Sequence, residues 1–261
     1  MQSIGIIGLG WLGKATAFKM QDQGFDVMGT VTSDKKQAEL NKEGLNTFQF
    51  RLGEKLPEAI KNCNILLITV PPRGGQFVED LSELAQELNS NTQVIFVSST
   101  SVYPDSNKIV QEKDAVDRIS PHSGISLLKA EAAFSQSKLN YIILRFAGLM
   151  GSGRHPGKFL AGRENVSGPQ SPVNMVHLDD CIGVILSVIK NKLERQILNV
   201  CSDLHPTRKE FYTKAALSIN LTPPQFNTTS SNFKIIDNTL SKRALQYSYK
   251  HPDPTEALKS V

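Results

Sequence analysis

Three glycines near the start of the chain, Gly8, Gly10 and Gly13, have the spacing of a phosphate-binding turn. In the pattern G-x-G-x-x-G the first glycine permits a tight turn, the second lets a pyrophosphate approach the backbone, and the third lets a helix pack closely on a sheet. The positive end of that helix and its free N–H groups attract phosphate. The spacing therefore predicts a dinucleotide site that also uses the enclosed residues Trp11 and Leu12. The alternative is a glycine turn that binds nothing.

The turn lies where this chemistry requires it, between a strand and a helix. The apolar run Ser3–Ile7 is typical of a strand buried on both faces. A helix-forming stretch, 11–23, follows and ends before Gly24, and 25–31 has the composition of a second strand. These segments form one βαβ unit, and that context makes the glycine motif specific.

The end of the second strand predicts which dinucleotide is bound. NAD sites usually place a carboxylate there to accept hydrogen bonds from the ribose hydroxyls. This chain instead has Thr32, Ser33 and then Lys35 and Lys36, whose hydroxyl and ammonium groups could hold a 2′-phosphate. We therefore predict NADP, with NAD as the alternative if a longer strand brings Asp34 to the ribose. The two lysines also fit an ordinary solvated helix start.

Strands and helices alternate along the rest of the chain. Residues 46–50 alternate between polar and apolar like a short strand, and apolar runs typical of buried strands lie at 64–70, 93–98, 141–145 and 196–201. Helical patterns lie at 56–61, 77–88, 178–190 and 206–220. This alternation predicts an α/β fold with a doubly wound parallel sheet. Proline ends the strand 64–70 at the carboxyl edge, where ligands bind, so Val70 and Pro71 are predicted cofactor contacts. The glycine-rich stretch 148–168 is predicted to be a long loop at the same edge.

The composition is that of a soluble, cytoplasmic protein. The net charge of +4 comes from 29 basic and 25 acidic residues without a block of either sign, so neither nucleic acid nor a membrane is an expected partner. Cys63, Cys181 and Cys201 are far apart in apolar segments, so we expect reduced, buried thiols and no metal site. The run before the glycine turn does not resemble a signal peptide, and the longest later apolar run, 182–189, is too short to span a membrane.

Four later segments resemble a single family in their order and spacing. They are 97–103 (V-S-S-T-S-V-Y), 145–154 (R-F-A-G-L-M-G-S-G-R), 176–180 (V-H-L-D-D) and 198–200 (L-N-V). In these residues the chain resembles the extended short-chain dehydrogenase/reductases, the NAD(P)-dependent epimerase/dehydratase branch. The resemblance implies a Rossmann-type domain over 1–150, with returning segments near 174–201, and a small C-terminal α/β substrate domain over 151–173 and 202–261. It also implies that Ser99 is the active-site hydroxyl.

One departure from the family pattern bears on catalysis. The family's pair Tyr-x-x-x-Lys should lie on the helix at 123–135, but Ile125 stands four residues before Lys129. The phenol that exchanges the substrate proton is therefore missing, as in an atypical branch that shares the motifs G-L-G-W-L-G and G-R-H-P-G. Without that phenol, Lys129 is expected on the helix surface. Tyr103 and His122 are the candidate substitutes, the histidine because it titrates near neutral pH.

Basic residues of the second half are predicted to bind an anionic group of a small-molecule substrate. Arg154 and His155 lie in the glycine-rich stretch. Arg145 ends a strand at the carboxyl edge, where a substrate contact and a structural salt bridge are equal alternatives. His177 is expected to pack between the sheet and a helix.

The residues support two hypotheses of function. The first is an NADP-dependent oxidoreductase or epimerase that acts on a small polar metabolite, such as a sugar derivative. The second is an NAD(P)-binding sensor or regulatory protein that has lost turnover. The opening I-G-I-I-G-L-G-W-L-G is also similar to the β-hydroxyacid dehydrogenases. Those enzymes continue into a long all-helical domain, and the predicted strands at 93–98 and 141–145 argue against this alternative. A homodimer is the oligomeric state that we keep open.

Overall fold

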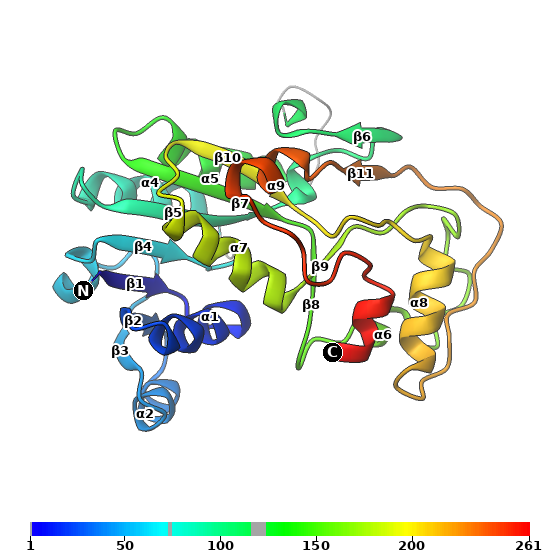
Figure 1. The fold of residues 1–261 in the computed structure, drawn as a ribbon, viewed down its shortest axis with the longest axis horizontal. Coiled ribbons are helices and arrows are strands. Elements are labelled where there is room, and N and C mark those ends of the chain that lie inside the picture. The colour runs from blue at the N-terminus through cyan, green and yellow to red at the C-terminus, as the bar shows by residue number, and fades with distance from the viewer. Residues whose placement is uncertain (1, 73–74, 116–123) are drawn as a thin grey trace. The chain divides into compact units, whose positions relative to one another are not determined.

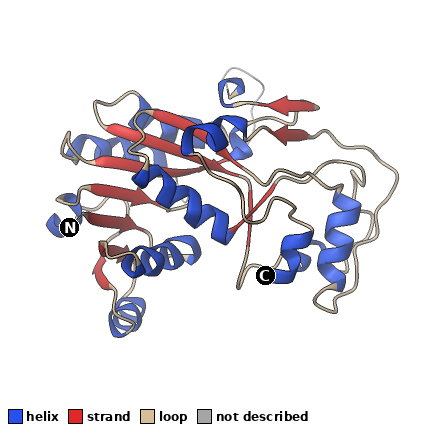
Figure 2. Ribbon diagram, in the orientation of Figure 1, coloured by secondary structure: helices blue, strands red, loops and turns tan. Residues whose placement is uncertain are grey.

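The computed structural model describes residues 2–72, 75–115 and 124–261. Its main element is a seven-stranded sheet with the strand order β10-β7-β5-β4-β1-β2-β3 (Figures 1 and 2). The strands are β1 (Ser3–Ile7), β2 (Asp26–Val31), β3 (Asn46–Gln49), β4 (Ile65–Ile68), β5 (Gln93–Ser99), β7 (Asn140–Phe146) and β10 (Gln196–Val200). The pairs β5–β4, β4–β1, β1–β2 and β2–β3 are all parallel. The predicted α/β Rossmann-type fold is confirmed.

The order of the strands reverses at β1, which lies between β2 and β4. In open α/β sheets the ligand binds at such a switch point, outside the carboxyl ends of the strands. Strands β1 and β4 are apolar and buried: Ile4 and Ile6 of β1 and Leu66 and Leu67 of β4 are 0% exposed. Burial on both faces makes this edge a rigid platform for the turn that follows β1.

Helices connect and flank the strands of the sheet. They are α1 (Trp11–Asp22), α2 (Asp34–Lys42), α3 (Glu58–Lys61), α4 (Phe77–Glu87) and α5 (Ile125–Ser135). A further helix, α7 (Leu178–Lys190), precedes β10 in the chain. Helix α1 packs on β1 and β2, and α4 packs against α5. Gly24 follows α1 with a φ of +82°, which confirms its predicted role at the end of that helix.

The described chain divides into two compact units. The first comprises residues 2–72, 75–99, 124–145 and 188–197, and the second comprises 100–115, 146–187 and 198–261. The domain boundaries predicted from the sequence, at residues 150, 173 and 201, stay a prediction. None of the helices in the described residues has the length and apolar character needed to cross a bilayer. All three cysteines are buried and free of disulfides, as expected.

The second unit contains two small pairs of parallel strands. Strand β6 (Lys108–Val110) pairs with β11 (Lys234–Ile236), and β8 (Gly148–Met150) pairs with β9 (Met175–His177). Its helices are α6 (Gly157–Leu160), α8 (Arg208–Leu217) and α9 (Thr239–Leu245). A cluster of buried apolar side chains forms its core: Met150, Val173, Met175, Phe211, Ala215, Ala257 and Leu258.

The prediction of a long loop over 148–168 is wrong, because this stretch contains β8 and α6. Its glycines allow close packing instead. A Cβ on Gly148 would lie 2.7 Å from the Met175 sulfur, and a Cβ on Gly157 would lie 2.1 Å from the carbonyl oxygen of Ala215. These glycines therefore let β8 approach β9 and let α6 approach α8.

Candidate functional site

The turn between β1 and α1 gives each of its glycines a different environment. Gly8 has a φ of +97°, a left-handed conformation that favours glycine, and a Cβ there would lie 2.9 Å from a methyl group of Val70. A Cβ on Gly13 would lie 2.2 Å from the carbonyl oxygen of Gly8. Gly10 is different, because no other segment of the described chain has an atom within 4 Å of its Cβ position. The fold itself requires Gly8 and Gly13, whereas the space above Gly10 is open to a ligand.

The start of α1 offers backbone donors to that space. Gly10 is the N-cap residue, so it has no side chain that could cap the first turn, and no acidic residue occupies that turn. Thr69 Oγ1 donates a hydrogen bond of 2.6 Å to the Gly8 carbonyl, and the Gly8 amide donates one of 3.1 Å to Thr30 Oγ1. These bonds fix the turn. The first N–H groups of a helix have no intrahelical acceptor, so this end of α1 can bind a phosphate.

A cleft of about 540 Å³ lies beside the turn, within the first unit. It brings together five of the residues that the sequence predicted for the cofactor: Gly8, Gly10, Thr32, Val70 and Pro71. The other five predicted residues, Trp11, Leu12, Gly13, Ser33 and Lys35, do not line it. Their contact with a cofactor stays a prediction.

Two basic side chains of the described residues line the cleft near the end of β2. Lys36 is one of them. The other is Arg51, whose Nη2 donates a hydrogen bond of 3.2 Å to the carbonyl oxygen of Thr32. Strand β2 ends at Val31, and Asp34 lies in α2, where its carboxylate accepts a hydrogen bond from the Gln49 amide. The longer strand that would have brought Asp34 to a ribose is therefore not present.

The sequence interpretation missed Arg51, although a signal for it existed. Val31 of β2 is in register with Gln49 of β3, so the residues that follow these two parallel strands lie side by side. Thr32 is the first residue after β2, and Arg51 is the second residue after β3. The interpretation also missed other residues that line the cleft, because they come from segments outside the glycine motif: Phe50, Leu52, Phe77 and Asp80.

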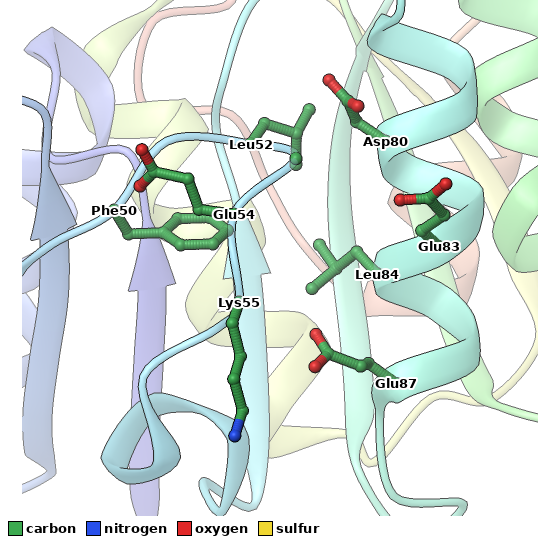
Figure 3. A pocket seen from close by; sticks show the side chains of 9 residues that line it. Phe50, Leu52, Glu54, Lys55, Asp80, Glu83, Leu84 and Glu87 are labelled. Carbon is green, nitrogen blue, oxygen red and sulfur yellow. The ribbon is translucent and has the colours of Figure 1, made fainter.

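A second cleft of about 230 Å³ adjoins the first and shares Phe50, Leu52 and Asp80 with it. Figure 3 shows Phe50 and Leu52 on one side and the carboxylates of α4, Asp80, Glu83 and Glu87, on the other. Lys55 is the basic residue among those that line it. Such a concentration of negative charge disfavours a phosphate in this second cleft.

Arg145 forms a buried ion pair in the first unit. Its Nη2 lies 2.6 Å from Glu131 Oε2 of α5, and the two side chains are 3% and 4% exposed. The hydroxyl of Ser98 donates a hydrogen bond of 2.5 Å to the same carboxylate. The structure therefore shows the salt bridge that the sequence left open for Arg145, and a substrate contact stays a prediction. The predicted catalytic residue Ser99 is the last residue of β5, next to this network.

The predicted proton donors have different surroundings. Tyr103, in the second unit, is 1% exposed, and its hydroxyl donates a hydrogen bond of 2.6 Å to Asn199 Oδ1. This bond holds the phenol inside the unit, and a catalytic role for it stays a prediction. His122 lies outside the described residues. Lys129 is exposed on α5, as expected for a residue without a tyrosine partner, and Ile125 is the first residue of that helix.

His155 and Arg154 lie before α6 in the second unit. Arg154 is exposed, whereas His155 is 8% exposed and both of its ring nitrogens are engaged. Nδ1 accepts a hydrogen bond of 3.0 Å from the Gly157 amide, and Nε2 lies 3.3 Å from Ser218 Oγ. Burial, and next the charge of Lys158, lower the pKa of His155. The neutral imidazole thus fixes α6, and contact with a substrate stays a prediction.

The surroundings of His155 predict a loss of stability in mild acid. Its folded pKa lies below the reference value of 6.5, so below that pH the unfolded chain binds more protons and the free energy of unfolding falls. We expect acidification from about pH 7.5 to about pH 5.5 to lower the melting temperature less in a His155→Asn variant than in the parent protein. Differential scanning fluorimetry measures both slopes. Equal slopes would contradict this explanation.

Comparisons with known proteins agree with this geometry. Residues 3–132 match the family described as the NAD-binding domain of 6-phosphogluconate dehydrogenase. Protein YeeZ of Escherichia coli K12 is 34% identical over 270 residues, which cover 97% of this chain and 98% of YeeZ. The first half of the chain thus resembles an NAD-binding Rossmann domain.

Solved structures show the same fold over the whole chain. A functionally unknown conserved protein from Silicibacter pomeroyi superimposes with a TM-score of 0.80 at 21% identity, covering 99% of this chain and 98% of that one. UDP-glucuronic acid 4-epimerase from Bacillus cereus, in complex with UDP-glucuronic acid and NAD, superimposes with a TM-score of 0.77 at 15% identity, covering 99% and 97%. The fold is therefore that of the epimerases and short-chain dehydrogenase/reductases.

Proposed function

The chain belongs to the family of protein YeeZ, and from that premise we propose that it is an NADP-dependent oxidoreductase or epimerase of atypical short-chain dehydrogenase type. Its substrate in this proposal is a small polar metabolite, such as a sugar derivative. The observation that carries the proposal is the cleft that joins the open turn at Gly10 to the basic side chains of Lys36 and Arg51.

The residues of this cleft fit a phosphorylated dinucleotide. The open space at Gly10 and the uncapped start of α1 suit a pyrophosphate. Arg51 and Lys36 provide the positive charge that a 2′-phosphate requires, and arginine matches phosphate with two parallel N–H donors. The carboxylate of Asp34 is occupied by Gln49. These contacts favour NADP over NAD.

A bound nicotinamide dinucleotide would supply hydride chemistry. The protein would hold the pyrophosphate at Gly10 and the 2′-phosphate at Arg51. The family resemblance assigns Ser99 to a hydrogen bond with the reacting oxygen of the substrate. Arg154, which is exposed, remains the candidate for an anionic group of the substrate. The B. cereus epimerase, which holds both a nucleotide sugar and NAD, supports a sugar derivative as the substrate.

A second candidate function is an NAD(P)-binding sensor or regulatory protein without turnover. It is favoured by the environment of the residues that could move a proton. Ile125 stands where the family has its tyrosine, and the hydroxyl of Tyr103 is buried against Asn199. A protein that had lost catalysis could keep the cofactor cleft intact, because the cleft residues are separate from these.

The two candidates are separated by one series of measurements. NADPH and NADH are titrated into the protein, and their binding is followed by fluorescence. Oxidation of NADPH is then followed by absorbance with a panel of aldehydes, ketones and nucleotide sugars. We expect NADPH to bind at least about tenfold more tightly than NADH, because one charge-assisted contact contributes about 1.5–3 kcal/mol. An Arg51→Ser variant should lose this preference. Lys55→Ser removes the same charge in the adjoining acidic cleft and should retain it.

The outcomes of this series decide between the enzyme and the sensor. Oxidation of NADPH with one class of carbonyl compound supports the enzyme. Tight binding without turnover across the panel supports the sensor. Tighter binding of NADH by the parent protein would contradict the NADP preference, and no binding of either dinucleotide would contradict both candidates.

A further inference from the structure

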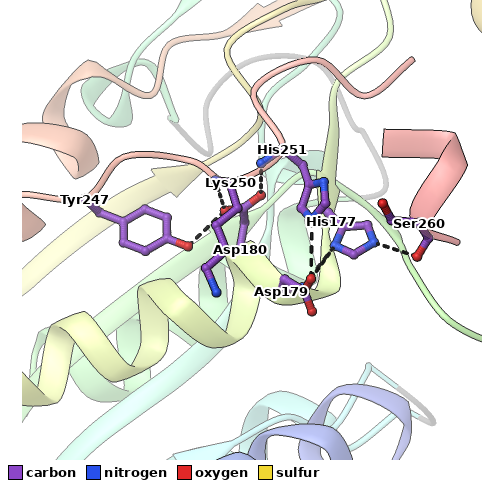
Figure 4. Close-up of polar contacts among 7 residues, drawn as sticks. All are labelled: His177, Asp179, Asp180, Tyr247, Lys250, His251 and Ser260. Atoms are coloured by element: carbon purple, nitrogen blue, oxygen red, sulfur yellow. Dashed lines mark hydrogen bonds and ion pairs between the residues drawn. The ribbon is translucent and has the colours of Figure 1, made fainter. Parts of the chain in front are cut away.

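Two imidazoles and a carboxylate meet in the second unit, where β9 passes into α7. His177 is the last residue of β9, Asp179 lies in the first turn of α7, and His251 comes from the C-terminal segment (Figure 4). Oδ2 of Asp179 lies 3.6 Å from Nδ1 of His177 and 3.3 Å from Nε2 of His251. The three atoms all lie within 4.8 Å of one another.

The separations in this cluster match those of ligands that share one ion. Two ligand atoms at about 2.0–2.1 Å from a tetrahedral zinc ion are about 3.4 Å apart. The Asp179 oxygen already lies near that distance from both imidazoles. A small adjustment of side chains would therefore close the triangle around an ion.

Neighbouring groups hold the segment that carries His251 in place. Asp180, which is 0% exposed, accepts hydrogen bonds from the backbone amides of Lys250 and His251 at 2.7 and 3.0 Å, and from the Tyr247 hydroxyl at 2.9 Å. Figure 4 shows these bonds fixing the segment that carries His251. Supporting contacts of this kind orient metal ligands in known sites.

The tautomer of His177 leaves the lone pair on Nδ1, the nitrogen that faces Asp179. Its Nε2 lies 3.4 Å from the carbonyl oxygen of Ser260, which can only accept, so the ring proton belongs on Nε2. Nδ1 then carries the lone pair, and it accepts a hydrogen bond of 3.2 Å from the Asp179 amide. An ion at Nδ1 would replace this one long hydrogen bond, whose donor amide lies in the first turn of α7.

We propose that His177, Asp179 and His251 bind a divalent transition-metal ion of the zinc class, with water as the fourth ligand. Imidazole nitrogen together with one carboxylate suits zinc, cobalt or nickel better than magnesium or calcium, which prefer oxygen ligands alone. His177 is 4% exposed and Asp179 is 53% exposed, so the site has a closed side and a side open to water. The bound ion would fasten the C-terminal segment to the start of α7.

The expectation of no metal site rested on the cysteines and did not consider this cluster. His251 is separated from Asp179 by 72 residues, a spacing that forms no recognisable metal motif. Only the fold brings the two residues together.

Isothermal titration of the full-length, chelator-treated protein with Zn²⁺ tests the proposal, and Co²⁺ serves as a spectroscopic probe. We expect one Zn²⁺ per chain, a rise in melting temperature on binding, and visible Co²⁺ absorption of the intensity typical of tetrahedral sites. His251→Asn and Asp179→Asn should each weaken Zn²⁺ binding at least about tenfold. His205→Asn alters another histidine of the same unit, outside the cluster, and should bind like the parent.

The Co²⁺ spectrum keeps the test decisive if a variant fails to fold, because it needs only the parent protein. Octahedral, weakly absorbing Co²⁺ would overturn the proposal. So would Zn²⁺ binding by a folded His251→Asn variant as tight as that of the parent, or parent binding no tighter than about 1 mM.

Discussion

Replacement of Gly10 by aspartate is expected to abolish dinucleotide binding without loss of stability. Gly10 is the N-cap of α1, with φ −79° and ψ −156°, and its Cβ position is open. Aspartate is a slightly better N-cap residue than glycine, so the helix should be as stable as before or gain about 0.3 kcal/mol. Its carboxylate, however, would lie where the pyrophosphate binds.

The loss of affinity should be at least about a hundredfold. Two like charges about 4 Å apart at a protein surface repel by about 4 kcal/mol, which exceeds the 2.7 kcal/mol that a hundredfold change represents. Fluorescence titration with NADPH measures the affinity, and differential scanning fluorimetry measures the stability.

Two further variants serve as comparisons for Gly10→Asp. Gln23→Glu adds the same charge at the other end of α1 and should leave NADPH binding unchanged. Gly13→Ala should lower the melting temperature, because its Cβ would lie 2.2 Å from the Gly8 carbonyl oxygen. A Gly10→Asp protein that binds NADPH within about threefold of the parent would refute the phosphate site at this turn.

Removal of the Glu131 carboxylate is expected to destabilise the protein by about 3–5 kcal/mol, because it removes the carboxylate that pairs with the buried Arg145 guanidinium. Arg145 is 3% exposed, and its Nε and Nη2 both donate to Glu131. The same change removes the acceptor of Ser98. Urea denaturation of Glu131→Ala, with the transition followed by circular dichroism, measures the free energy of unfolding.

Two controls separate this effect from the general cost of altering α5. Lys129→Ala lies on the same helix but is exposed, and it should change the free energy of unfolding by no more than about 0.5 kcal/mol. A double variant, Glu131→Met with Arg145→Met, should recover most of the lost stability, because no unpaired charge remains. A loss below about 1 kcal/mol in Glu131→Ala would show that the ion pair is replaceable.

Local patterns in the sequence were sufficient to predict the framework of the first unit. The apolar run at β1 predicts a buried strand and the glycine after α1 predicts the end of a helix, and both predictions depend only on neighbouring residues in the sequence. The same holds for the position of the phosphate-binding turn. Gly8, Gly10, Val70 and Pro71 were assigned to the cofactor from such signals, and they do line one cleft.

Contacts between distant segments were beyond this kind of prediction. Arg51 reaches Thr32 only because β3 lies in parallel register beside β2. Arg145 finds Glu131 on another element, and nothing near either residue indicates the pairing. Gly148 and Gly157 were taken for loop glycines, because a glycine that admits a neighbouring strand or helix looks the same in a sequence.

The order of the strands also governs how the chain can fold as it leaves the ribosome. Strand β5 is covered on its outer edge by β7, and β7 in turn by β10. A nascent chain that has not yet reached Asn140 would therefore carry an open, apolar edge at β5, which includes Val94, Ile95 and Phe96. Such edges readily pair with other chains. Fragments that end before β7 should consequently aggregate during expression, although they contain the entire glycine motif.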